Sequence, residues 1–194
     1  NTINRFLQQW LIAGETEMGR QLVDEGRGAG IDVYLLRRIA VMTIYNPSNK
    51  TISQDTVELV ERRIRHVLRE DVRSVSAGIG NCFVALISER SDQQLRELLM
   101  EISQKVRSEA QCELCMGVDS TPVGGAQIKD GYARALKAAR AALPGTLVFY
   151  DDILLELVTG DVPEQTRQEF VHRVFKGCEP ERIPEYLRIL SVLY

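Results

Sequence analysis

The order of the apolar patterns along this chain limits its fold more than any other feature. Five apolar runs typical of strands cover residues 38–45, 71–77, 82–88, 112–118 and 147–150. Apolar residues at helical spacing cover 53–69, 92–106 and 128–143. In chain order the pattern is βαββαβαβ, and a Gly-rich turn at 78–81 joins its two middle strands. This order predicts a mixed sheet covered by helices, with an antiparallel hairpin in the middle.

Composition limits the class of protein. The chain has 194 residues, of which 44% are hydrophobic and 26% charged, so it can bury one sizeable core. Its net charge of -3 gives no overall electrostatic reason to bind nucleic acid or an anionic membrane. No apolar run reaches the roughly 18 residues of a spanning helix, and the amino end lacks a signal-peptide pattern. We therefore predict a cytoplasmic protein without a membrane partner.

Two of the four cysteines have a spacing that zinc sites use, but the pattern around them argues against a metal. Cys112 and Cys115 fall in a predicted strand, where positions three apart point to opposite faces. No second pair of this kind follows, and the two histidines, His66 and His172, lie in helical patterns. We predict buried structural thiols and no metal-binding residues.

Helical patterns flank the predicted sheet domain at both ends. Residues 1–30 form a helical lead-in, in which Trp10 and Phe6 either pack on the domain or anchor a dimer. Residues 31–153 form the sheet domain. Residues 154–194 form a helical extension whose apolar stripe continues to the final residues. We predict that the chain is part of a longer protein.

The stretch from Met116 to Asp152 resembles one family of proteins. It reads MGVDSTPVGG, then the helix IKDGYARALKAARAAL, then LVFYDD. This stretch resembles the sugar-diacid and purine-catabolism transcription regulators (CdaR/PucR type). The resemblance implies an α+β nucleotide-cyclase fold, GGDEF-like and ferredoxin-related, with a mixed, mainly antiparallel sheet. In that family the domain lies between a ligand-sensing region and a DNA-binding helix-turn-helix. One departure is Leu36, where the family usually has proline.

The positions that would hold catalytic metal ions in an active GGDEF domain are altered here. Aligned on the phenylalanine of that signature, Asn81 and Cys82 stand where aspartate and glutamate would be. The first strand is followed by no carboxylate before Asp55. A neutral amide and a thiol do not replace ionised oxygens around Mg²⁺. We therefore predict that the chain is not an enzyme, with no catalytic or cofactor-binding residues and no cofactor.

The resemblance favours a noncatalytic regulatory domain of a bacterial transcription regulator. Such a domain would relay the sensing of a small-molecule effector, bound outside this chain, to a DNA-binding domain. It would also aid self-association, so we expect a homodimer. DNA contact would be made only through a helix-turn-helix domain beyond residue 194.

Alternative functions remain open at three places. The hairpin at 78–81 could bind a nucleotide or another anion, with Lys50 and Arg73 as the nearest basic residues in sequence. Gly124 and Gly125 could form an anion site before the following helix. That helix carries a basic face, which is either solvated or a contact surface for another domain, a second subunit or DNA. Its residues are Lys129, Arg134, Lys137 and Arg140.

Overall fold

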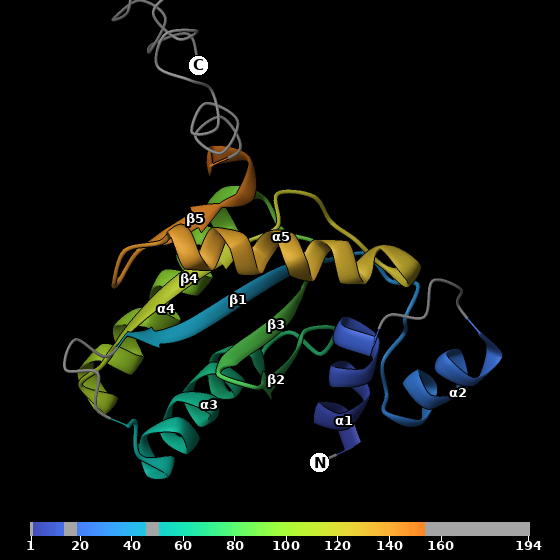
Figure 1. The fold of residues 1–194 in the computed structure, drawn as a ribbon, viewed down its shortest axis with the longest axis horizontal. Helices are drawn as coiled ribbons and strands as arrows, with labels where there is room; N and C mark the ends of the chain where they lie inside the picture. The colour runs from blue at the N-terminus through green and yellow to red at the C-terminus, as the bar shows by residue number, and fades with distance from the viewer. Residues whose placement is uncertain (1, 14–18, 46–50, 154–194) are drawn as a thin grey trace, which may run out of the picture. The chain divides into compact units, whose positions relative to one another are not determined.

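The computed structural model describes residues 2–13, 19–45 and 51–153 of the chain. Its centre is a five-stranded sheet with the order β2-β3-β1-β4-β5 (Figure 1). The strands are β1 (Arg37–Tyr45), β2 (Val75–Ile79), β3 (Cys82–Ser88), β4 (Glu113–Val118) and β5 (Leu147–Phe149). Neighbouring strands pair antiparallel except β4 and β5, which are parallel.

The helices alternate with these strands in the predicted order. They are α1 (Thr2–Gln8), α2 (Arg20–Gly28), α3 (Gln54–Leu68), α4 (Asp92–Ala110) and α5 (Ile128–Ala141). A π-helical turn at Gln9–Ala13 follows α1, and a 3-10 turn at Gly125–Gln127 precedes α5. From β1 to β5 the order is βαββαβαβ, so the predicted mixed, mainly antiparallel sheet with covering helices is confirmed.

The described residues belong to one compact unit, Asn1–Ile153. The predicted extension at 154–194 lies outside them. Within the part of the chain that the structure describes, no helix combines the length and apolar character needed to cross a membrane.

Strand β1 lies at the centre of the sheet and is covered on both faces. Its residues 37–42 are all buried, and alternate side chains enter two separate cores. Ala40 and Met42 join the core that α3 and α4 cover. Ile39 and Val41 join the core that α1 and α5 cover, so the helices form two layers on either side of the sheet (Figure 1). A nearly unbroken apolar run is what a strand in this position requires.

The two helices on the first face begin at serine caps. The Ser53 hydroxyl accepts a hydrogen bond from the Thr56 N–H at the start of α3. At the start of α4, Ser91 and Gln94 form a reciprocal capping box. Each helix then buries one apolar stripe against the sheet. The buried residues are Val60, Ile64, Val67 and Leu68 in α3, and Leu95, Leu99, Ile102, Ser103 and Val106 in α4.

The lead-in helix α1 packs on the second face of the sheet. Trp10 and Phe6 are each only 3% exposed, and their ring centroids lie 5.6 Å apart. The Trp10 indole N–H donates a hydrogen bond to the Gly125 carbonyl oxygen at 3.2 Å. The sequence left two roles open for Trp10 and Phe6, packing on the domain or anchoring a dimer. In the structure both side chains pack on the domain.

Helix α5 packs so closely on β4 that one strand position must be glycine. A Cβ atom added to Gly117 would lie 1.9 Å from the Ala139 nitrogen and 2.4 Å from the Ala135 carbonyl oxygen. Both contacts are to backbone atoms, so no flexible side chain can move aside. The helix meets the strand through small residues, which permit this approach. They are Ala135, Ala138 and Ala139.

Strand β2 starts later than the sequence predicts. The predicted range 71–77 is wrong, because the strand begins at Val75. The Asp71 carboxylate instead holds the preceding residues in a turn. It accepts hydrogen bonds from the Arg73 N–H and from the hydroxyls of Ser74 and Ser88.

The hairpin turn between β2 and β3 is also shorter than predicted. Ile79 pairs with Cys82, so only Gly80 and Asn81 form the turn. Gly80 has a φ of 57° at the first turn position, where a type II′ turn takes glycine. Gly78 lies inside the strand ladder and has no positive φ. The turn conformation therefore accounts for glycine at position 80. No special backbone conformation requires glycine at position 78.

We expect Gly117→Ala to destabilise the fold by about 1–3 kcal/mol, because the added methyl group forces α5 away from the sheet. Urea unfolding followed by circular dichroism measures this change in the free energy of unfolding. Gly78→Ala is the matched control in the same sheet, since a Cβ there meets no neighbouring atom within 4 Å. Equal stability of the two variants would contradict the close packing at Gly117.

Asp71 should make the stability of the fold depend on pH. Burial alone would raise the pKa of Asp71, but hydrogen bonds from Ser88, Ser74 and the Arg73 N–H, together with the charge of Arg90, outweigh burial and lower it. A carboxyl with a lowered folded pKa adds stability above its unfolded pKa of about 3.9, and this stability is lost as the pH falls through the folded pKa.

We therefore expect Asp71→Asn to be less stable than the unmodified protein near about pH 6, with the difference shrinking below about pH 4. Urea unfolding at a series of pH values measures it. Asp24→Asn, at a side chain that is 62% exposed, is the control and should show little difference at any pH. A difference for Asp71→Asn that stays constant with pH would show that the carboxylate charge is not what matters.

Candidate functional site

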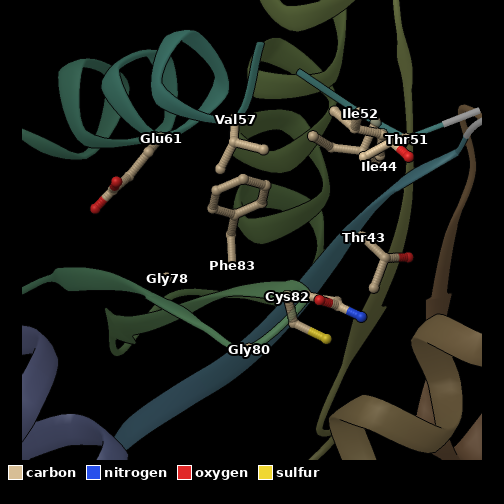
Figure 2. A pocket seen from close by; sticks show the side chains of 11 residues that line it. Thr43, Ile44, Thr51, Ile52, Val57, Glu61, Gly78, Gly80, Cys82 and Phe83 are labelled. Carbon is tan, nitrogen blue, oxygen red and sulfur yellow. The ribbon is translucent and has the colours of Figure 1, made fainter. Parts of the chain in front are cut away.

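A cavity of about 520 Å³ opens between α3, the end of β1 and the β2–β3 hairpin. Figure 2 shows its lining side chains, which come from these three elements and from the residues that lead into α3. Its volume lies within the range of about 300–1,000 Å³ that small-molecule sites have. The lining residues are Thr43, Ile44, Thr51, Ile52, Val57, Glu61, Gly78, Gly80, Asn81, Cys82 and Phe83.

The cavity exists partly because Gly78 has no side chain. The residues on either side of it, Ala77 and Ile79, face the core on the far side of the sheet, so position 78 faces α3. A Cβ built at Gly78 meets nothing within 4 Å, which means that the space in front of it is empty. A glycine inside a strand lowers stability, and such positions often mark the close approach of a ligand.

The floor of the cavity is apolar. Phe83 is buried on β3 directly opposite Gly78, and Val57 packs against the same core from α3. Figure 2 shows the Phe83 ring next to the Val57 side chain. Ile44 and Ile52 add further apolar surface. An apolar floor with a few polar groups around it is typical of small-molecule sites.

One lining side chain among the described residues carries a formal charge. Glu61 of α3 has a side chain that is 24% exposed, and its Oε1 accepts a hydrogen bond from Arg65 Nη2 at 2.7 Å. Its Oε2 accepts no hydrogen bond among the residues that the structure describes. Arg65 itself is 49% exposed and does not line the cavity. One oxygen of the carboxylate is therefore open to a ligand.

The side chain of Cys82 lies on the opposite face of the sheet from Phe83, against the core that α5 covers. Burial raises the pKa of Cys82, and the positive charge of Arg140 on α5 opposes this shift only in part. Burial also raises the pKa of Tyr132, with contributions from Cys82 and Arg140. The thiol is therefore neutral at physiological pH, and Arg140 is a basic residue near the hairpin that the sequence analysis assigned to the helix face alone.

The two basic residues expected beside the hairpin are not in the cavity lining. Arg73 is exposed in the turn before β2, and its carbonyl oxygen accepts a hydrogen bond from Arg37 Nε at 2.9 Å. Lys50 lies outside the described residues. The alternative of an anion bound at Gly125 also loses support, since the Gly125 N–H donates to the Val33 carbonyl oxygen at 2.7 Å.

The described residues contain no group of three or more histidine, cysteine, aspartate or glutamate side chains placed to hold a metal ion. Cys112 packs against the core that contains Leu114 and Met116, whereas Cys115 alternates to the other side of β4. Burial raises the pKa of both thiols, and the charge of Glu113 adds to this effect at Cys115. The two thiols point to opposite faces of β4, so they cannot share one metal ion.

Of the four basic residues on α5, one forms an ion pair with a buried carboxylate, and three form no ion pair within the described residues. Arg134 forms a two-fold hydrogen-bonded ion pair with Asp119, through Nε and Nη2 at 2.8 Å each. Asp119 is only 1% exposed, so this pair compensates a buried charge. The hydrogen bonds and charge of Asp119 raise the pKa of Arg134 against the effect of burial. The other basic residues make no ion pair within the described part of the chain; they are Lys129, Lys137 and Arg140.

Comparisons with known proteins show the family of this fold. Residues 13–141 match the model of the GGDEF-like domain family, so the chain belongs to that family. One solved structure that matches is the active GGEEF domain of a diguanylate cyclase from Vibrio cholerae, with 16% sequence identity and a TM-score of 0.47. The match covers 66% of this chain and 88% of that one. A comparison with curated proteins gave no match.

These findings confirm the predicted GGDEF-like fold and correct one prediction. We predicted that the chain is not an enzyme, and that prediction is wrong as an exclusion, because residues 13–141 match the GGDEF-like domain family. The prediction was based on Asn81 and Cys82 at the hairpin and on the lack of a carboxylate between the first strand and Asp55, whereas the family match covers residues 13–141. The chain has a cyclase-like fold, and whether it turns over a nucleotide is decided by measurement.

The sequence analysis found the hairpin side of the cavity and missed the α3 side. It singled out Gly78, Gly80, Asn81 and Cys82 at the turn. Glu61 lies in the helical range 53–69 and was given no role, because helical periodicity does not distinguish water from a cavity. The polar end of β1 at Thr43 was assigned to an ordinary strand. Gly78, a glycine inside a strand, was the available signal for the cavity. It was missed because the predicted turn at 78–81 included it.

We expect loss of the Arg134 side chain to destabilise the fold, since it leaves a buried carboxylate without its partner. Arg134→Met should cost up to about 3 kcal/mol, the low end for buried pairs, because 31% of the Arg134 side chain is exposed. Lys137→Met on the same helix is the control and should have little effect. Chemical denaturation measures both, and equal losses would show that the Asp119 contact contributes nothing.

Proposed function

We propose that this chain is the regulatory domain of a cytoplasmic bacterial transcription regulator, and that it binds a small effector molecule in the hairpin cavity. The observation that carries this proposal is the cavity itself, with its apolar floor, its few polar groups and the empty space in front of Gly78. The resemblance of residues 116–152 to the sugar-diacid and purine-catabolism regulators supports the regulatory role.

In this proposal the effector binds within the sheet domain itself. The sequence analysis expected the effector to bind outside this chain. The cavity favours binding inside it, because α3, the end of β1 and the hairpin converge on one space large enough for a small molecule. A nucleotide or another cyclase-type ligand is one class of effector, and a small diacid is another.

A bound effector would act by shifting the population of packing arrangements. The walls of the cavity belong to three separate elements, so a ligand that contacts all three stabilises the arrangement in which they are closest. A change in the position of α3 or the hairpin would alter the surface that the domain offers to a second copy of the chain. We propose that a homodimer and a DNA-binding domain elsewhere in the protein respond to this change.

We expect the purified chain to bind at least one of GTP, cyclic di-GMP or a small diacid with a micromolar Kd, which corresponds to about -8 kcal/mol. Isothermal titration with and without Mg²⁺ measures the affinity, and analysis of the nucleotides afterwards measures turnover directly. Gly78→Val should abolish the heat of binding by filling the cavity. Gly28→Val adds the same side chain at a position on α2 that is also open, away from the cavity, and should leave binding unchanged.

Binding that Gly78→Val does not affect would place the ligand elsewhere and contradict the proposal. Circular dichroism of both variants ensures that the result reports the cavity and not the folding of the domain. A solution mass measurement with and without ligand tests the proposed self-association, and an unchanged monomer in both states would contradict it.

A further inference from the structure

Strand β2 forms an open edge of the sheet. In the strand order β2-β3-β1-β4-β5, it pairs only with β3. Helices α3 and α1 both contact β2, but each packs on one face of the sheet, so neither takes the place of a neighbouring strand (Figure 1). Within the part of the chain that the structure describes, the main-chain groups of Val75–Ile79 form no hydrogen bond outside the pairing with β3. This edge can therefore accept a further strand.

The register of the hairpin decides which residue presents its main-chain groups at this edge. The two-residue turn closes on Ile79 and Cys82, and the pair next to such a turn is a hydrogen-bonded pair. These pairs alternate along an antiparallel ladder, so Ala77 and Val75 also bond to β3, whereas the N–H and C=O groups of Ser76 point away from it. The strand contains no charged residue, proline or bulge, which are the usual means of blocking a further strand.

A groove of about 240 Å³ lies beside the start of this edge. Leu68 at the end of α3 and Ile3 of α1 both line it, together with Val75 and Ser76. Because α3 and α1 cover opposite faces of the sheet, a groove that both line must lie at the edge. Val72, which also lines it, is apolar and 95% exposed. The volume is below the range of about 300–1,000 Å³ typical of small-molecule sites, so the groove suits a side chain of a bound segment.

The rim of the groove is basic. Arg65 and Arg69 line it from α3, and Arg62 lies on the same side of that helix, three positions before Arg65. Arg62 and Arg69 are exposed and form no ion pair within the described residues. Arg65 pairs with Glu61 at the surface, where such a pair contributes little. Asp71, the one acidic lining residue that the structure describes, is already bonded within its own turn. The rim therefore favours a partner that carries carboxylates.

We propose that the β2 edge binds an extended segment of a partner protein that carries acidic side chains. The segment adds to the sheet as the strand next to β2, with main-chain hydrogen bonds to Ser76. One of its apolar side chains enters the groove beside Leu68, and its carboxylates pair with Arg65 and Arg69. This surface shares no lining residue with the hairpin cavity, so the inference goes beyond the proposed function and does not depend on it.

The probe is a capped, fluorescein-labelled peptide of about eight residues in which valine and glutamate alternate, since alternate side chains of an added strand face the groove and the rim. The same peptide with lysine in place of glutamate is the basic control. Fluorescence anisotropy with the full chain measures both affinities. We expect the acidic peptide to bind with a Kd below about 1 mM and about tenfold more tightly than the basic one. Added salt should weaken the acidic peptide, because the rim charges are exposed.

Two pairs of variants assign the binding to the edge. Ser76→Pro removes the outward N–H, which the ladder to β3 does not use, and should weaken the acidic peptide by about tenfold. Ser76→Ala keeps this N–H and should bind like the unmodified chain. Arg69→Glu reverses a rim charge and should also weaken the acidic peptide by about tenfold. Arg27→Glu, at a side chain on α2 that is 79% exposed and outside the groove, is its matched control and should leave binding unchanged.

Each outcome supports or overturns the proposal. A folded Ser76→Pro variant that binds the acidic peptide as well as Ser76→Ala would show that the peptide does not pair with the edge. If circular dichroism shows that Ser76→Pro is unfolded, the comparison of Arg69→Glu with Arg27→Glu decides, and equal binding by these two overturns the proposal. A short DNA duplex that displaces the peptide would assign the basic rim to nucleic acid. The proposal also fails if the acidic peptide does not bind at about 1 mM or binds no better than the basic one.

Discussion

The burial of strand β1 on both faces is the constraint on which the rest of the structure depends. A strand that pairs on both sides and is covered on both faces has no route for its side chains to water, so two cores must be built around it. One core takes Ala40 and Met42 under α3 and α4, and the other takes Ile39 and Val41 under α1 and α5. The lead-in helix is therefore part of the domain, since it covers apolar surface that the sheet exposes on that side.

The sequence predicted this architecture because its signals are local and periodic. Unbroken apolar runs marked the buried strands, and apolar residues at helical spacing marked the helices, so the order of elements followed directly. The start of β2 and the register of the hairpin could not be predicted in this way. The Asp71 carboxylate holds the residues before β2 in a turn, although their sequence is equally compatible with a strand. Which of two hydrogen-bonding arrangements a short polar segment adopts depends on Ser88, a partner in the next strand, and no local pattern contains it.

The candidate site was harder to predict than the fold for a related reason. A cavity is defined by atoms that are absent, and in a sequence the missing side chain of Gly78 looks the same as a glycine that a turn requires. Glu61 has the spacing of a solvated helix residue, and only the gap opposite gives it another role. The hairpin residues Asn81 and Cys82 drew attention because they differ from a known signature. They describe one edge of the cavity, and the exclusion of an enzyme, which was based on them and on the lack of a carboxylate before Asp55, went further than these few positions can support.

The helices on the two faces of the sheet pack against it differently, and this difference decides which contacts a ligand could change. On the α5 face, Gly117 leaves no space between strand and helix, and a Cβ at Gly131 would lie 2.8 Å from an oxygen of the buried Asp119 carboxylate. Displacing α5 would break backbone contacts and the pair of Asp119 with Arg134 together. On the α3 face, an open cavity beside Gly78 separates the sheet from the start of the helix, whereas Val60 and Ile64 hold the rest of the helix in the core. A ligand in this cavity would therefore contact the start of α3 and the hairpin, and the buried face of the helix would stay packed on the sheet.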